Sequence, residues 1–99
     1  MVPFLQNANN LTKLDLDHNN IQSEGFNILF RALSDSPIER LCCNNCGIES
    51  IVIDNEHRPE HLKQLYLDGN SINAAGCREI AKLLQGEDAT LTELHLVDN

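Results

Sequence analysis

One hydrophobic frame recurs four times along this chain, and it limits the fold to repeat architectures. The copies begin at Leu11, Ile38, Leu62 and Leu91, so they start 27, 24 and 29 residues apart. Apolar residues or cysteine stand at the first, fourth and sixth positions of each copy, and Asn or Cys stands at the ninth. A repeat of this period indicates units that cannot bury their hydrophobic side alone and therefore stack on one another.

The centre of each frame predicts a short β-strand. In the first copy, Leu14 and Leu16 flank Asp15, and alternate residues of a strand point to opposite faces. We therefore expect Leu14 and Leu16 to face the core and Asp15 to face outward. Equivalent outward positions of the four copies would then stand in rows across a parallel ladder, about 4.8 Å apart.

The ninth position of the frame predicts a side chain that satisfies backbone groups. After each strand the chain must turn inward, where its amides lose contact with water. An Asn side chain can hydrogen-bond such amides, and this position holds Asn19, Asn70 and Asn99. Cys46 takes the place in the second unit, as a small residue with a weak S–H donor.

Two of the segments that follow the strands predict helices. Four apolar residues spaced i, i+3, i+4 and i+7 form one helical face: Phe26, Leu29, Phe30 and Leu33. A matching set stands 51 residues later: Cys77, Ile80, Ala81 and Leu84. We expect both sets to be buried.

The residues around these two sets predict where the helices begin and end. Ser23 and Asn73 are suitable N-cap residues, because their side-chain oxygens can accept the first backbone N–H groups. Gly25 and Gly76 occupy matching positions in the two helices, and Gly86 could end the second.

The second unit departs from this pattern. It is 24 residues long, and its return contains the β-branched run Ile51, Val52 and Ile53, which forms helices less readily. We expect one or two helical turns or an irregular segment there, with a local break in uniform curvature.

The full pattern L-x-x-L-x-L-x-x-N-x-I, followed by G-x-x-x-L-x-x-x-L, resembles the ribonuclease-inhibitor-like subfamily of leucine-rich repeats. The resemblance implies an α/β solenoid of about three and a half units. It has a curved parallel strand ladder on its concave side and helices on its convex side. Members of this family serve as inhibitors, GTPase-activating proteins, innate-immune sensors and ubiquitin-ligase adaptors. The resemblance therefore implies a concave face that binds another protein.

We expect residues 1–99 to form a single domain. Its predicted units span residues 1–10 (partial, the tail of a preceding helix), 11–37, 38–61 (atypical), 62–90 and 91–99 (partial). Because neither end shows a polar capping unit, we expect a fragment of a longer array. The apolar residues at the ends, namely Phe4, Leu5, Leu94 and Leu96, would then be covered by a partner, pair end to end or fray.

The candidate binding site is the set of side chains that the frame turns outward on the strand face. Tyr is enriched at binding hot spots, and Tyr66 is the aromatic residue that the frame places there. The set comprises Lys13, Asp15, Asp17, Arg40, Cys42, Asn44, Gln64, Tyr66, Asp68, Glu93 and His95, with Val97 beside them.

The cysteines offer an alternative function as a thiol or metal site. Cys42, Cys43 and Cys46 include a C-x-x-C pair, which would need further ligands to hold zinc. The frame turns Cys43 and Cys46 toward the core and Cys42 outward, and it puts Cys77 at a core position. Packed free cysteines therefore explain the pattern with fewer assumptions, and Cys42 is the one candidate for a reactive thiol.

Nothing in the sequence predicts an enzyme or a bound cofactor. His57 to His61 match H-x-x-E-H, a zinc-protease pattern that requires a helix, but Pro59 would break that helix. The chain has neither a glycine-rich phosphate loop nor a G-x-S-x-G nucleophile elbow. We therefore expect no catalytic residue, metal or cofactor.

The net charge and the N-terminal residues limit the classes of partner and the cellular location that we expect for this chain. The formal net charge is −8, which disfavours binding to nucleic acid and anionic lipid. The same charge suits a basic protein partner, and the alternative is that it only keeps the chain soluble. The sequence has no apolar run of membrane-spanning or signal-peptide length. We expect an intracellular, cytoplasmic protein-binding module. The alternatives are a regulatory fragment of a GTPase-activating protein, innate-immune sensor or ubiquitin-ligase adaptor, or the thiol site.

Overall fold

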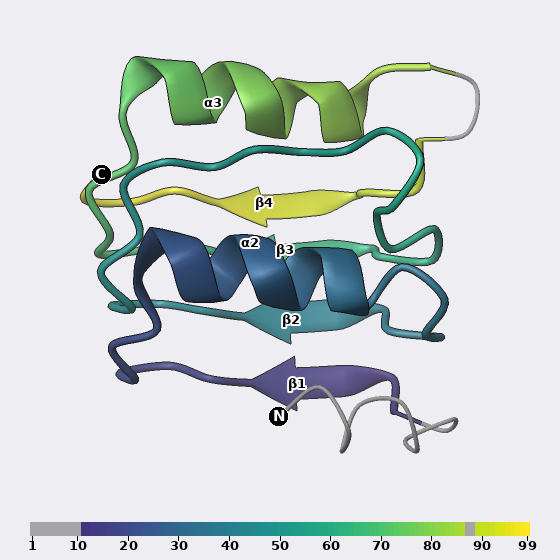
Figure 1. Cartoon of the computed structure of the whole chain (residues 1–99), viewed down its shortest axis with the longest axis horizontal. Helices are drawn as coiled ribbons and strands as arrows, with labels where there is room; N and C mark the ends of the chain where they lie inside the picture. The colour runs from purple at the N-terminus through teal and green to yellow at the C-terminus, as the bar shows by residue number, and fades with distance from the viewer. Residues whose placement is uncertain (1–10, 87–88) are drawn as a thin grey trace.

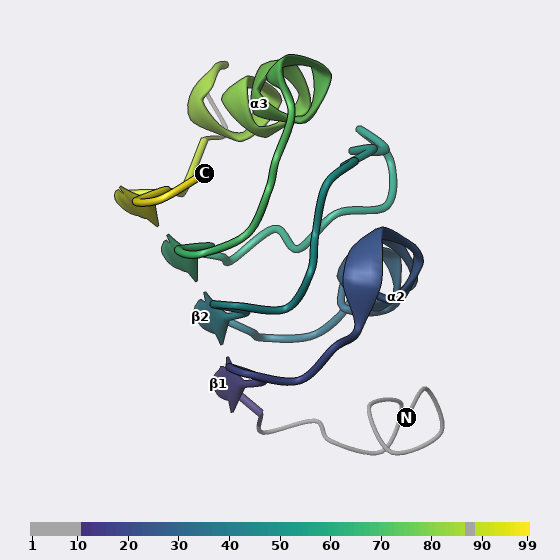
Figure 2. The same ribbon diagram turned by 90° about the vertical axis from the view of Figure 1, so that its left-hand side faces the viewer.

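The computed structural model describes residues 11–86 and 89–99, and these form an α/β arrangement of two layers. Four strands make one parallel sheet in chain order, as Figure 1 shows. They are β1 (Lys13–Asp15), β2 (Arg40–Cys42), β3 (Gln64–Tyr66) and β4 (Glu93–His95). Helices α2 (Gln22–Ala32) and α3 (Ala74–Ala81) lie on one side of this sheet (Figure 2).

The strand register agrees with the alignment of the four frames. Leu14 pairs with Leu41, Leu41 with Leu65, and Leu65 with Leu94. The backbone pairing continues past each short strand, since the N–H of Leu67 donates to the carbonyl of His95 at 2.9 Å. One hydrogen-bonded ladder therefore joins all four units.

The core lies between the strands and the helices, and the inward residues of the central units fill it. Leu41, Cys43, Leu65 and Leu67 are each at most 1% exposed. The equivalent leucines of β1 and β4 pack against this core but are only partly buried. The reason is that each outer strand has a described neighbour on one side only.

Helix α2 buries the predicted face. Phe26, Leu29, Phe30 and Leu33 are all at most 2% exposed, and the rings of Phe26 and Phe30 stack with centroids 5.3 Å apart. The predicted N-cap is wrong, however, because the helix begins at Gln22 without a side-chain cap. Ser23 is inside the helix, where its hydroxyl bonds the next unit instead.

Helix α3 buries part of the predicted face, since Ile80 is 2% exposed as expected, but its other buried residues differ. Gly76, Ile80 and Leu83 are its buried residues, whereas Cys77 is exposed and Leu84 is 52% exposed. The chain tightens after Ala81 into the 3-10 helix η1 (Lys82–Leu84), which turns Leu83 inward in place of Leu84. The N-cap prediction is confirmed, since Asn73 Oδ1 accepts the Gly76 N–H at 2.7 Å.

The return of the second unit is irregular, which is one of the two forms expected for it. Residues 47–53 contain no helix, and they run between α2 and α3 (Figure 2). On the α2 side, Ser23 Oγ accepts the N–H groups of Glu49 and Ser50, both at 2.9 Å. On the α3 side, Glu79 Oε1 accepts the Ile53 N–H at 2.9 Å. Side chains of the two helices thus replace the hydrogen bonds that a helical return would make internally.

The asparagines at the ninth position carry out the predicted role to different extents. Asn70 is buried and bonds four backbone groups of two units at 3.2 Å or less. Asn19 is exposed, and it donates to the carbonyl of Leu16 at 3.1 Å. Cys46 also behaves as expected, because its Sγ lies 3.1 Å from the carbonyl oxygen of Leu16.

The structure bears on the predicted N-terminal helix tail and on the question of a membrane-spanning helix. The predicted helix tail at residues 1–10, with Phe4 and Leu5, lies outside the described residues. Within the described residues, neither helix has the length and hydrophobicity to cross a bilayer.

Candidate functional site

The predicted site residues lie on the sheet face turned away from the helices. We call this surface the open strand face. The registers arrange its side chains in rows, of which the first contains Lys13, Arg40, Gln64 and Glu93. The middle row contains Asp15, Cys42, Tyr66 and His95. Residues just past the strands form a third row, namely Asp17, Asn44 and Asp68, with Val97 after them.

Tyr66 stands at the centre of a group of interacting side chains on this face. Its ring lies 4.5 Å from the His95 ring, and the Arg40 guanidinium carbon lies 5.0 Å from the Tyr66 centroid. The Tyr66 hydroxyl donates to Glu93 Oε2, which also lies 3.0 Å from His95 Nε2. We call these four residues the Tyr66 cluster. Because contacts surround its ring and hydroxyl, Tyr66 is held in one orientation.

The hydrogen bonds of the Tyr66 cluster shift the pKa values of Glu93 and Tyr66. The bonds from Tyr66 and then His95 hold the pKa of Glu93 below its ordinary value, because both favour the carboxylate. The same bond raises the pKa of Tyr66, since the phenol must keep its proton to donate. At neutral pH the cluster therefore contains a neutral phenol that donates to an ionised carboxylate.

Cys42 is less accessible than the sequence predicts. The frame turns Cys42 outward and makes it the one candidate for a reactive thiol, but it is only 7% exposed. Burial raises the pKa of its thiol, although a hydrogen bond with Arg40 opposes that shift.

The row past the strands is engaged with the backbone of the repeat itself. Asp17 Oδ1 accepts the N–H of Asn44 at 2.8 Å, and Asn44 Oδ1 accepts the N–H of Asp68 at 2.7 Å. Asp68 Oδ1 in turn accepts the N–H of Val97 at 2.7 Å. These three predicted binding residues therefore hold successive units in register, a role that the sequence reasoning did not assign to them.

The remaining predicted residues lie at the margins of the Tyr66 cluster. Lys13 and Asp15 are exposed on β1, and Asp15 Oδ1 accepts the N–H of Asp17 at 2.9 Å. Gln64 is half-buried on β3. The sequence reasoning missed Glu39 and Lys63, which stand one residue before the outward position of their units. Their carboxylate and ammonium groups are 3.2 Å apart.

The other cysteines divide into buried and exposed thiols. Cys43 and Cys46 are 0% exposed, as predicted, and burial raises the pKa of both thiols. Cys77 was predicted at a core position but is exposed, because α3 buries the neighbouring Gly76 instead. Within residues 11–86 and 89–99, no three His, Cys, Asp or Glu side chains are grouped as metal ligands would be.

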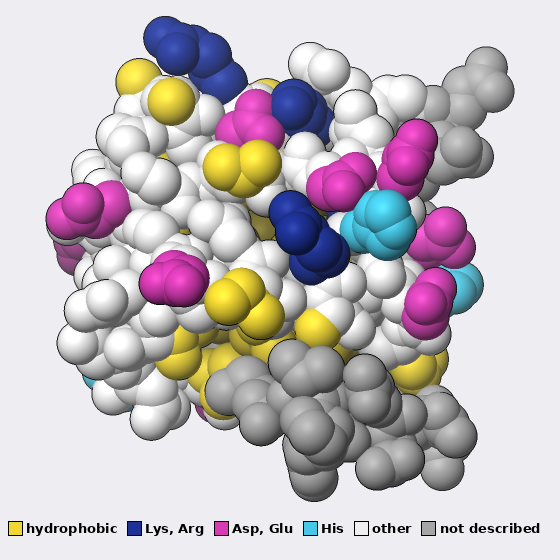
Figure 3. Space-filling view, viewed as in Figure 1, with side chains coloured by type: hydrophobic (Ala, Val, Ile, Leu, Met, Phe, Trp, Pro, Cys, Tyr) yellow, Lys and Arg dark blue, Asp and Glu magenta, His cyan; other side chains and the backbone are white. Residues whose placement is uncertain are grey.

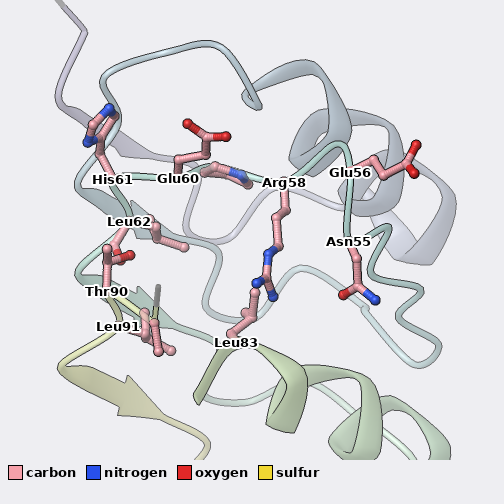
Figure 4. A pocket seen from close by; sticks show the side chains of 11 residues that line it. Asn55, Glu56, Arg58, Glu60, His61, Leu62, Leu83, Thr90 and Leu91 are labelled. Carbon is pink, nitrogen blue, oxygen red and sulfur yellow. The ribbon is translucent and has the colours of Figure 1, made fainter. Parts of the chain in front are cut away.

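The H-x-x-E-H segment lies beside a hollow at the edge of the molecule. Residues 57–61 are not helical, and His57 Nδ1 lies 3.0 Å from Asp54 Oδ2, so the two histidines do not share a helical face. The hollow has a volume of about 600 Å³, and Leu83 and Leu91 also line it (Figure 4). Arg58 projects across it and donates to the carbonyl of Lys82 at 3.1 Å, at the end of α3. Arg58 therefore has a structural role there.

On the helix-bearing side, the described residues form no group comparable to the Tyr66 cluster. Acidic, basic and hydrophobic side chains are interspersed over it (Figure 3), with hydrophobic side chains gathered toward its lower edge. The large exposed hydrophobic residues of α2 and the irregular return are Ile28 at 54% and Val52 at 61%.

Comparison with known proteins finds one family whose model matches part of the chain. A family model described as "Leucine Rich repeat" matches residues 7–25 and 58–81, which cover the strands of the first and third units. No curated protein and no solved structure gives a significant match. By these two matches the chain is similar to leucine-rich repeat proteins, and its four-stranded parallel ladder with helices on one side is an α/β fold.

Proposed function

We propose that this chain is a protein–protein interaction module that binds its partner through the open strand face. Leucine-rich repeats generally mediate protein–protein interaction. The observation that carries the proposal is the Tyr66 cluster, in which an aromatic side chain on the open face is fixed by Arg40, Glu93 and His95.

The restraint of Tyr66 favours binding on entropic grounds. A side chain that is already fixed loses little freedom when a partner covers it, so less of the contact energy is lost to ordering. Tyr and Arg are also the residue types that dominate measured hot spots. The cluster contains one of each, with the Arg40 guanidinium beside the Tyr66 ring.

The surroundings of the cluster define the rest of the proposed surface. The ladder is proposed to curve with its strands on the inner side, so that the open strand face is concave. Asp17, Asn44 and Asp68 would fix the shape of this surface through their backbone bonds. The carboxylates of Asp15, Asp17 and Asp68 would meet basic groups of the partner at this end of the strands, in keeping with the net charge of −8.

Site-specific photocrosslinking tests the proposal. A benzophenone side chain is introduced at Gln64, next to Tyr66 in β3, and in a separate variant at Glu24 on α2. We expect a discrete protein adduct from position 64 in an extract of the source cells, and its loss when Tyr66→Ala is added. Equal adducts from positions 24 and 64, or a position-64 adduct that survives Tyr66→Ala, would overturn the proposed site.

A further inference from the structure

A cleft of about 330 Å³ opens where the amino ends of the four strands meet the open strand face. Residues from all four units line it, among them Thr12, Lys13, Glu39, Arg40, Lys63 and Thr92. It lies next to the Tyr66 cluster, because Arg40 belongs to both.

The charge of this cleft is opposite to that of the chain. Its lining holds three cations, Lys13, Arg40 and Lys63, and one carboxylate, Glu39, whereas the chain as a whole carries −8. Glu39 Oε1 is 3.2 Å from Lys63 Nζ, so the carboxylate is already paired. The carboxylate of Glu93, which also acts on Arg40, accepts the hydroxyl of Tyr66 and lies close to His95. Three cations against these two carboxylates leave a local positive charge.

Three backbone carbonyls that line the cleft are already engaged within the repeat. The carbonyl of Thr12 accepts two N–H groups of the second unit, from Glu39 at 2.8 Å and Arg40 at 3.0 Å. The carbonyls of Glu39 and Lys63 each accept two N–H groups of the next unit in the same way. A carbonyl oxygen has two lone pairs, so these three are fully used. The groups left to a ligand include the cationic donors of Lys13 and Arg40.

We propose that this cleft binds a carboxylate side chain in an acidic segment of the partner protein. The inference rests on the proposed function and deepens it. The open strand face would then meet acidic groups of the partner at the amino ends of its strands and basic groups past their carboxyl ends. Such opposite charges at two ends of one surface fix the orientation of a bound partner.

Arg40 connects this site with the Tyr66 cluster. A guanidinium can pair with a carboxylate through two parallel N–H donors while its flat face stays against an aromatic ring. Arg40 lies against the Tyr66 ring at 5.0 Å, so its orientation is restrained before the ligand arrives. Binding of the carboxylate would therefore also alter the surroundings of Tyr66.

Titration of the full chain with a deca-glutamate peptide tests the inference, with nuclear magnetic resonance as the readout. The chain carries −8, so non-specific electrostatics oppose this probe, and saturable binding would have to come from a local site. At low salt we expect chemical-shift changes that are confined to residues 12–13, 39–40, 63–66 and 92–93. The double variant Lys13→Gln with Lys63→Gln should weaken binding about tenfold, because it removes the free ammonium of Lys13 and leaves the carboxylate of Glu39 without its cation, where it repels the ligand.

A matched control changes the same charge on the other side of the molecule. Arg78→Gln with Lys82→Gln removes two cations from the helical layer and should leave the affinity for deca-glutamate within about twofold. Absence of saturable binding, equal loss in both double variants, or equal shifts with inorganic phosphate would overturn the carboxylate site. None of these results depends on the photocrosslinking at position 64, so this inference and the proposed function can fail separately.

Discussion

The side-chain oxygen of Asn70 accepts a hydrogen bond from the backbone N–H of Cys46 at 2.9 Å, across the boundary between the third and second units. It also accepts the N–H of Ile48, while its amide group donates to the carbonyls of Cys43 and Leu67. One buried side chain therefore satisfies the inward turn of one unit and the strand end of the next.

Asn70→Ala should lower the free energy of unfolding by about 1–3 kcal/mol, since it leaves buried backbone groups without partners. Urea unfolding measures the effect. Asn19→Ala is the control, because Asn19 is exposed and should cost less than about 1 kcal/mol. Equal losses at the two positions would contradict the role assigned to the buried asparagine.

Removing the side chains that hold the irregular return should loosen it selectively. Ser23 accepts the N–H groups of Glu49 and Ser50, and Asn27 Oδ1 accepts that of Val52 at 3.0 Å. Ser23→Ala with Asn27→Ala should speed hydrogen exchange of those three amides by more than it speeds exchange at Leu65. Glu24→Ala, on the exposed side of α2, should leave the pattern unchanged.

Titration of Tyr66 should report its bond with Glu93 directly. The chain has one Tyr and no Trp, so tyrosinate absorbance follows this side chain alone. The native pKa of Tyr66 is raised, and Glu93→Gln should return it toward 10, because the ionised acceptor is lost. Glu39→Gln removes a carboxylate without a bond to Tyr66 and should leave the titration in place.

The same bond has a consequence at acid pH. The pKa of Glu93 is lower in the folded chain than its ordinary 4.5. The ionised Glu93 carboxylate therefore stabilises the folded chain fully at pH values above 4.5. That effect disappears as pH falls through the folded pKa. An unchanged Tyr66 titration in Glu93→Gln would argue against both statements.

Thiol alkylation should distinguish the four cysteines. Cys77 is exposed, whereas Cys42, Cys43 and Cys46 are buried with raised pKa values. Iodoacetamide should therefore modify one thiol of the native chain quickly, and Cys77→Ser should remove that reaction. Mass spectrometry identifies the site, and faster labelling at Cys42 would mean that the middle row is open.

The strands and the face they present could be predicted because the frame constrains them strongly. Moving a strand by one residue would turn Leu65 and Leu67 outward and Tyr66 inward, so the hydrophobic pattern leaves one register. The pairing of Leu14, Leu41, Leu65 and Leu94 agrees with that pattern.

The buried face of α3 could not be predicted from spacing alone. The alignment with α2 placed Cys77 and Leu84 inside, but η1 tightens the end of the helix and selects Leu83. The side chains that hold the return also differ, since Ser23 and Asn27 correspond to Ala74 and Arg78 in α3. A repeat alignment gives the average unit, whereas these contacts depend on which unit lies beside each helix.

The side-chain contacts within the site also could not be predicted from the sequence pattern. The frame placed Arg40, Tyr66 and Glu93 on one face, but their mutual bonds depend on side-chain reach across strands. The roles of Asp17, Asn44 and Asp68 as backbone acceptors depend on turn geometry after each strand, which spacing does not specify.

The proposed binding of a protein to the open strand face depends on Tyr66. Its decisive measurement is the equilibrium affinity for the partner identified by crosslinking, obtained by calorimetry with Tyr66→Ala and Glu24→Ala. We expect Tyr66→Ala to weaken binding at least about tenfold while the variant still unfolds cooperatively, and Glu24→Ala to bind as the original chain does. Unchanged affinity in Tyr66→Ala, or an equal loss in Glu24→Ala, would contradict it.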